Sequence, residues 1–185
     1  MHTVTVTLES LSPYGQSRYH NTPKKEKESS ADYEERTWRE RGHWNKNGRM
    51  FIPPMAFKHC LAECAKFLGI QIPGRGKERY TKHFASGIMV TDGLVLPVEK
   101  ADVEGLWLHV PADGTPGGRK RVEKCFPYVE EWSGDVVYYV LDDTITKTVF
   151  EQHMEQAGQF IGIGFFRPAN RGYWGRFKPL KFEWE

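Results

Sequence analysis

The sequence lacks any apolar run close to the roughly 20 residues that cross a membrane. Its start, MHTVTVTLES, lacks the basic and apolar regions of a secretory signal. It has only three cysteines in 185 residues, an odd and sparse set. We therefore expect a cytoplasmic protein with no disulfide framework and no membrane partner.

Acidic residues are missing from 161–181, where five bases stand. The stretch 130–155 is the opposite, with seven acids and one lysine, although the net charge is only +2. Such segregation predicts a basic face suited to a polyanion and an acidic face that can serve self-assembly. Aromatic residues are 14% of the chain, and aromatics interleaved with Arg and Lys favour binding of single-stranded nucleic acid.

Hydrophobic residues are 39% and charged residues 27%, as in a folded protein, and the length predicts one domain over 1–185. Alternation in 2–8 predicts a strand, and Pro53-Pro54 opens a helix that Gly69 ends. The apolar face of this helix has helical spacing: Phe57, Leu61, Cys64, Ala65 and Leu68.

Gly and Pro punctuate 70–129, where we expect a hairpin over 85–98 with Asp92-Gly93 at its turn, a strand at 105–111 and a flexible loop at 112–121. The range 135–141 predicts another strand. Asp142-Asp143-Thr144 then caps a helix to about Ala157, and strands follow at 160–166 and 173–184. This order predicts an α+β, ferredoxin-like (RRM-like) βαββαβ core. The core covers about 1–69 and 130–185, and a long β-rich insertion covers about 70–129.

The stretch 14–49 is polar and holds no aliphatic residue larger than alanine, which predicts a long loop. Trp38 and Trp44 stand in it among several arginines, and a merely solvated loop has little reason to expose tryptophan. The loop is thus either a mobile surface insertion or a binding segment.

The segment IGIGFFRPANRGYWGRFKP (161–179) interleaves glycines with bases and aromatics. Exposed amides in such a glycine-rich loop can cradle phosphates. The alternative is a tight β-hairpin with a solvated tip. The segment lacks the GxxxxGK[ST] pattern, so it is not a nucleotide P-loop.

Three segments together resemble the RAMP superfamily of CRISPR proteins, and most closely its effector backbone subunits (Cas family seven). They are VTVTLESLSPYGQSRYH, NGRMFIPPMAFKHCLAECAKFLG and IGIGFFRPANRGYWGRF. They are similar to the family's opening strand and turn, its short strand and first helix, and its C-terminal glycine-rich loop. Pro54 and Met55 stand where that family has Gly-Ser.

The resemblance implies a sequence-independent RNA-binding subunit that oligomerises along a guide or similar strand with other CRISPR effector subunits. The insertion would be a thumb that wedges between nucleotides. The candidate nucleic-acid-binding residues are Arg18, Arg36, Trp38, Arg39, Arg41, Lys58, Arg75, Lys77, Arg79, Arg167, Arg171, Tyr173, Trp174, Arg176 and Lys178.

Catalysis is the weaker hypothesis. Some members of the family cut RNA with an aspartate in the loop before the first helix, where Asp32 stands, and His20 has the chemistry of a general base. His59, Cys60 and Cys64 lack a second cluster to complete a metal site, so Cys60 and Cys64 are interpreted as buried apolar residues. No cofactor or metal is expected.

Three other functions stay open: a RAMP-fold endoribonuclease, a single-stranded DNA binder, and a phage-borne backbone mimic or interaction protein. The sequence does not separate RNA from single-stranded DNA, because a contact to the 2′-hydroxyl has no readable signature.

Overall fold

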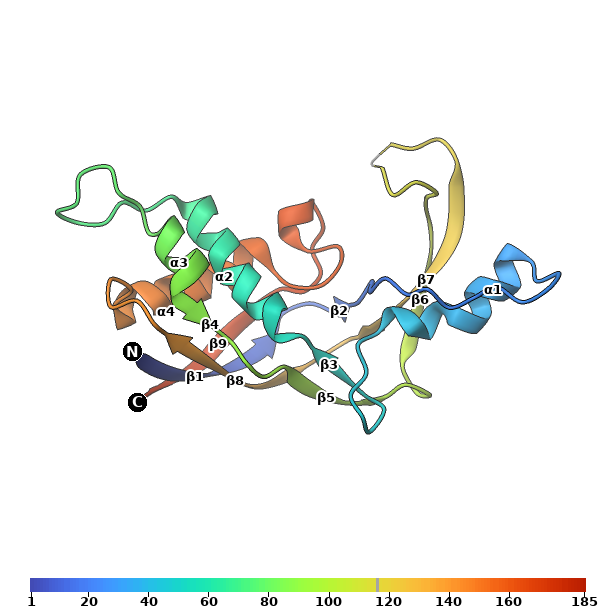
Figure 1. The fold of residues 1–185 in the computed structure, drawn as a ribbon, viewed down its shortest axis with the longest axis horizontal. Helices are drawn as coiled ribbons and strands as arrows, with labels where there is room; N and C mark the ends of the chain where they lie inside the picture. Colours follow the sequence, from blue (N-terminus) through green and yellow to red (C-terminus); the bar gives the residue numbers. More distant parts are fainter. Residues whose placement is uncertain (116) are drawn as a thin grey trace.

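A four-stranded antiparallel sheet forms one end of the molecule in the computed structural model, which describes residues 1–115 and 117–185 (Figure 1). Its strands are β1 (His2–Ser10), β4 (Ile88–Met89), β8 (Ser133–Val140) and β9 (Phe177–Trp184), in the order β4-β8-β1-β9. The chain is therefore a mixed α+β protein with antiparallel pairing.

Strand β1 confirms the strand expected at 2–8. Its alternating residues Val4, Val6 and Leu8 are fully buried, because every second side chain of a strand points to the same face. Val6 lies opposite Val136, and Val4 lies opposite Tyr138 on β8, so two apolar stripes meet in one core.

Helices α2 (Pro54–Leu68), α3 (Thr81–Gly87) and α4 (Lys147–Gln156) lie together at this end of the molecule (Figure 1). The predicted apolar face of α2 is confirmed, since Phe57, Leu61 and Cys64 are buried. Gly69 ends α2 in the left-handed conformation at φ 58°, as expected. The helix expected after Asp142 begins later, because Thr146 is its N-cap and its hydroxyl accepts the Val149 N–H.

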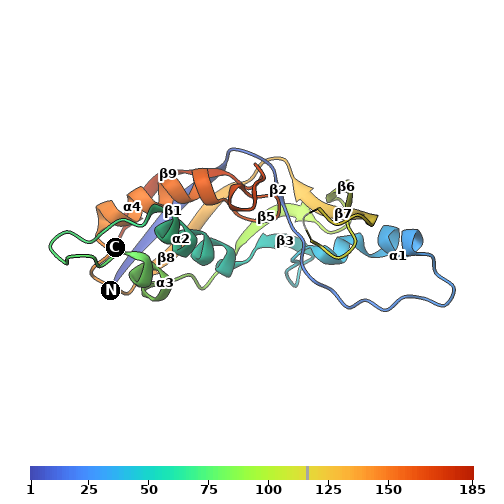
Figure 2. The same ribbon diagram turned by 90° about the horizontal axis from the view of Figure 1, so that it is seen from above.

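Shorter sheets form the other end of the molecule (Figures 1 and 2). A three-stranded sheet has the order β2-β7-β6, from β2 (Tyr14–Gly15), β6 (Glu104–Pro111) and β7 (Arg121–Val129). Strands β3 (Arg49–Ile52) and β5 (Leu94–Glu99) pair with each other. The strand expected at 105–111 is confirmed by β6, whereas β7 was not expected. The loop expected at 112–121 includes residue 116, which lies outside the described residues.

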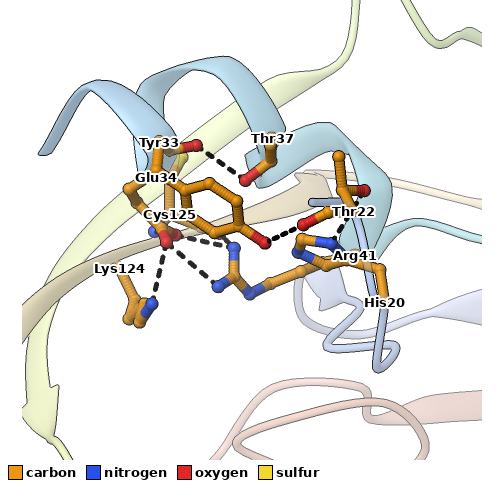
Figure 3. A network of polar contacts seen from close by, with 8 residues as sticks. All are labelled: His20, Thr22, Tyr33, Glu34, Thr37, Arg41, Lys124 and Cys125. Carbon is orange, nitrogen blue, oxygen red and sulfur yellow. Dashed lines mark hydrogen bonds and ion pairs between the residues drawn. The ribbon is translucent and has the colours of Figure 1, made fainter. Parts of the chain in front are cut away.

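The stretch 14–49 is not the continuous loop that its polarity predicts. It contains β2, helix α1 (Ser30–Thr37) and a 3-10 turn at Trp38–Arg41. A buried network of ion pairs and hydrogen bonds, together with apolar burial, holds this stretch in a folded conformation (Figure 3). Glu34 on α1, only 2% exposed, accepts hydrogen bonds from Arg41 at 2.6 Å, Lys124 at 2.9 Å and the Cys125 N–H at 2.9 Å.

The Glu34 network holds helix α1 against strand β7, which pairs with β6 in an antiparallel hairpin. Burial by itself would raise the pKa of Glu34, but the hydrogen bonds from the Cys125 N–H, Lys124 and Arg41 outweigh it and lower the pKa. The carboxylate therefore stays charged in the folded protein, and three donors compensate its desolvation.

Two strand predictions are wrong. The range 85–98 is not a hairpin, because β4 pairs with β8 while β5 pairs with β3. The range 160–166 is not a strand either. A π-helical turn at Ala157–Ile161 continues α4, and the glycines that follow take positive φ angles that break an extended ladder. The last strand begins at Phe177 rather than at 173.

No helix among the described residues has both the length and the apolarity to cross a membrane.

Substitution of Glu34 by Gln should lower the free energy of unfolding by about 3–5 kcal/mol at neutral pH, because Arg41 would then be a buried charge without its counter-ion. Urea unfolding followed by tryptophan fluorescence measures this loss. Because the folded pKa of Glu34 is depressed, its contribution is present above the usual carboxyl pKa and is lost as pH falls through the folded value. The variant should therefore lose less stability on acidification than the parent.

Glu183→Gln is the matched control, since Glu183 and its partner Lys181 are both more than half exposed. Equal losses in the two variants would contradict a structural role for the Glu34 network.

Candidate nucleic-acid interface

Two adjoining hollows lie where α2 begins, and they share Ala56 and Gly164. We call them the paired hollows. The first, of about 210 Å³, is lined by Tyr14, Gln16, Ser17, Arg18, His43, Pro53, Ala56, Gly164 and Phe165. The second, of about 170 Å³, is lined by Ala56, His59, Cys60, Gly162, Ile163, Gly164 and Arg167. Residues from the chain's first 20, from its first long helix and from its C-terminal loop thus meet at one place.

The start of α2 supplies the middle of the paired hollows. Its N-cap is Pro53, which caps no amide with its side chain, and its first turn contains no acidic residue. Backbone N–H groups at a helix N-terminus carry partial positive charge and lack partners within the helix. Pro53 and Pro54 have no N–H, and the Ala56 N–H donates to the Pro53 carbonyl at 3.0 Å, so this end of α2 favours an anion through the partial positive charge of the helix end.

The loop 162–175 forms the opposite wall and is fixed to β2 and to Pro13, the residue before it. The Phe165 N–H donates to the Gly15 carbonyl at 3.1 Å, and the Gly175 N–H donates to the Pro13 carbonyl at 2.7 Å. Gly164 has φ 78°, and a Cβ there would overlap the Gly15 carbonyl oxygen. The position therefore needs glycine both for its backbone angle and for the close approach.

Gln16 braces the first hollow from inside the protein. It is 3% exposed; its amide nitrogen donates to the Phe51 carbonyl at 2.8 Å, and its amide oxygen accepts the His43 N–H at 2.6 Å. One side chain thus holds three segments at their relative positions. Sequence reasoning missed Gln16 and His43 as site residues, because a lone Gln or His in a polar stretch carries no distinguishing pattern, and it considered His59 only as a metal ligand.

The lining of the paired hollows is basic. Arg18 is exposed, and Arg167 forms an ion pair with Glu63 at 2.8 Å while remaining 23% exposed. Burial, and then the charge of Arg18, lower the pKa of His43, so that ring is neutral at neutral pH. None of the described lining residues carries a carboxylate. An anionic ligand would meet the exposed charge of Arg18, and it would compete with Glu63 for Arg167.

Several candidate arginines and lysines already have carboxylate partners away from the paired hollows. Arg36 pairs with Glu28 at 2.6 Å, Arg41 with buried Glu34, and Lys178 with Glu9 at 2.8 Å. Arg75, Lys77 and Arg79 lie in the loop between α2 and α3, at the end of the molecule opposite α1 (Figure 1). Lys58 donates to the Ala85 carbonyl at 3.0 Å.

The candidate aromatics divide into buried and exposed rings. Trp38 was expected to be exposed, but it is 6% exposed and Arg39 stacks on it at 4.2 Å. It packs against Gly105 of β6, so it anchors the 3-10 turn to the hairpin. Trp174 is also buried, at 8%, whereas Tyr173 is 63% exposed. Tyr173 and Arg171 lie together beside a separate hollow. The Arg176 side chain donates to the Gln159 and Tyr173 carbonyls.

The two candidate catalytic residues have structural contacts. Asp32 is exposed in the first turn of α1, where its carboxylate accepts the hydroxyl of the N-cap Ser29 at 2.6 Å. His20 contacts the Thr22 hydroxyl at 3.1 Å and stacks on Tyr33 (Figure 3). Burial lowers the pKa of His20, with a further lowering from the charge of Arg41.

The cysteines are buried. The Cys60 and Cys64 thiols donate to the Ala157 and His153 carbonyls, and burial raises the pKa of both. Both therefore stay protonated, which confirms them as apolar packing residues. Within the described part of the chain, no group of three or more His, Cys, Asp or Glu residues could hold a metal ion.

No family model and no curated protein matches the chain. Among solved structures, 33 chains match it. One belongs to a "CRISPR RNA-guided surveillance complex", with 11% sequence identity and a TM-score of 0.38. The match covers 95% of this chain and 66% of that chain, so the chain spans slightly less than two thirds of that neighbour's length.

Substitution of Gly164 by Ala should destabilise the protein more than substitution of Gly48 by Ala. Both glycines have positive φ, at 78° and 74°, but a Cβ at Gly48 meets nothing within 4 Å. Gly48→Ala should therefore cost only the backbone term of about 1–2 kcal/mol. Gly164→Ala adds a collision with the Gly15 carbonyl, so its loss in the free energy of unfolding, measured by urea unfolding, should be larger. Equal costs would show that the loop is not seated tightly against β2.

Proposed function

We propose that the chain binds single-stranded RNA through its sugar-phosphate backbone at the paired hollows, as a sequence-independent backbone subunit of a CRISPR-type effector complex. One observation carries the proposal. The three segments on which the resemblance to the RAMP superfamily rests all contribute to the lining of the first hollow, through Arg18, Ala56 and Gly164 among others. Three segments far apart in sequence thus share one surface.

The chemistry of the paired hollows suits phosphate. The positive end of the α2 dipole and the two arginines, Arg18 and Arg167, present positive charge to one region, and Gly164 lets the backbone bend there. Contacts of this kind position a strand without reading its sequence. A guide-binding subunit needs this property, because it must accept any guide.

The finer fold assignment is part of the same proposal. The main sheet and its helices follow the chain order β1, α2, β4, β8, α4, β9, with other elements between them. A strand–helix–strand–strand–helix–strand order supports a ferredoxin-like core. The hairpin of β6 and β7 projects at the far end from this sheet and is the candidate thumb (Figure 1).

The double variant Arg18→Gln, Arg167→Gln should weaken binding of a short labelled RNA by about tenfold or more in fluorescence anisotropy. Each lost phosphate contact should also reduce the slope of log K against log salt by about 0.7. Arg36→Gln is the control, since Arg36 is paired with Glu28 outside the paired hollows. Matched DNA strands separate an RNA binder from a general single-strand binder. Unchanged affinity and salt slope in the double variant would overturn the paired hollows as the interface.

Purification with and without nuclease tests assembly on the strand. Size-exclusion chromatography should give a large species with a high ratio of absorbance at 260 nm to that at 280 nm, which collapses to a smaller species after nuclease treatment. A clean monomer under both conditions, with no shift of labelled RNA at low salt, would contradict the backbone-subunit proposal.

A further inference from the structure

A third hollow, of about 440 Å³, opens between strand β6 and the loop 166–174. We call it the aromatic slot. Its walls are Leu106 and Leu108 from β6, and Phe166, Arg171, Tyr173 and Trp174 from the loop. Arg171 supplies the charge among the described lining residues, and no carboxylate stands with it.

Two rings of the aromatic slot are exposed to solvent. Phe166 is 42% exposed and Tyr173 is 63% exposed, while Trp174 beneath them is 8% exposed. Exposed aromatic surface gathered around one hollow marks a binding surface rather than a solvated loop tip. An arginine beside those rings adds a planar cation that stacks on aromatic systems.

The backbone of the aromatic slot is strained. Three non-glycine residues of the described chain have positive φ, and two of them, Phe166 at 53° and Arg171 at 65°, line this hollow. A bulky residue in this region is energetically costly, and such strain gathers at functional sites. The loop retains it through its own hydrogen bonds, from the Trp174 N–H to the Phe166 carbonyl at 3.0 Å and from the Gly172 N–H to the Arg167 carbonyl at 3.1 Å.

The rings are also held from behind. Phe166 packs on Phe165 with ring centroids 4.6 Å apart, and Phe165 stacks on Phe126 of β7 at 4.8 Å. The slot is thus built into the junction between the C-terminal loop and the hairpin. Its aromatic wall is preorganised, which lowers the entropic cost of binding a flat ligand.

We propose that the aromatic slot holds one unstacked nucleobase of the bound strand, stacked on Tyr173 and Phe166 with Arg171 at its edge. The inference rests on the proposed function. Phe165 lines the paired hollows and Phe166, the next residue, lines the aromatic slot, so a phosphate in one is within the reach of a base in the other. Stacking accepts every base, which preserves sequence independence.

The test compares a short labelled RNA with a strand of equal length and charge in which abasic sites replace the bases. The parent protein should bind the base-containing strand about tenfold more tightly. Tyr173→Ala should bind both strands equally, with the parent's affinity for the abasic strand. Tyr173→Phe keeps the ring and should keep the preference. Phe67→Ala, at a ring 62% exposed on α2, is the control and should behave as the parent.

A second measurement separates the aromatic slot from the proposed function. Saturation-transfer NMR with adenosine should give a signal that Tyr173→Ala removes, while ribose 5-phosphate gives no Tyr173-dependent signal. If the parent binds neither strand but retains the adenosine signal, the proposed function fails and the slot stands. Equal affinity for both strands, or absence of the adenosine signal, overturns the slot as a base-binding site.

Discussion

The backbone hydrogen bonds between the loop 162–175 and the segment 13–15 are the constraint on which the rest of the site depends. Phe165 donates to Gly15, and Gly175 donates to Pro13, so the C-terminal loop is fixed to the chain that leaves β1. A side chain at Gly164 would separate the two. This close approach sets the distance between the loop and the start of α2, and it thereby forms the paired hollows.

The same seating places adjacent residues on two surfaces. Phe165 faces the first of the paired hollows and packs on the β6–β7 hairpin through Phe126, whereas Phe166 is turned to the aromatic slot by its positive φ. A polar, basic surface and an aromatic surface thus share one short loop. Phosphate contacts and base stacking have different physical origins, and the strand that we propose as ligand would use both.

Strong local patterns made much of the fold predictable. Alternation at 2–8 and helical spacing over 54–68 each match burial in the structure, because one face of each element packs in the same core. The pairings of 85–98 and the shape of 160–166 were not predictable in this way. Ile88 pairs with Val140 and Leu94 pairs with Ile52, both far away in sequence. The π-helical turn that continues α4 includes apolar residues whose pattern predicts a strand.

The site was less predictable than the fold because residue type does not reveal how a charge is used. Arg36 and Arg41 occur in the same polar stretch as Arg18, yet carboxylates neutralise the first two and leave Arg18 exposed. Residue type is equally uninformative for Trp38. Its ring is buried against the β6–β7 hairpin, although the polar sequence around it predicts a solvent-exposed loop. The acidic partners make the difference: Glu28 and Glu34 pair with Arg36 and Arg41, whereas Arg18 stays exposed where the start of α2 meets the loop 162–175.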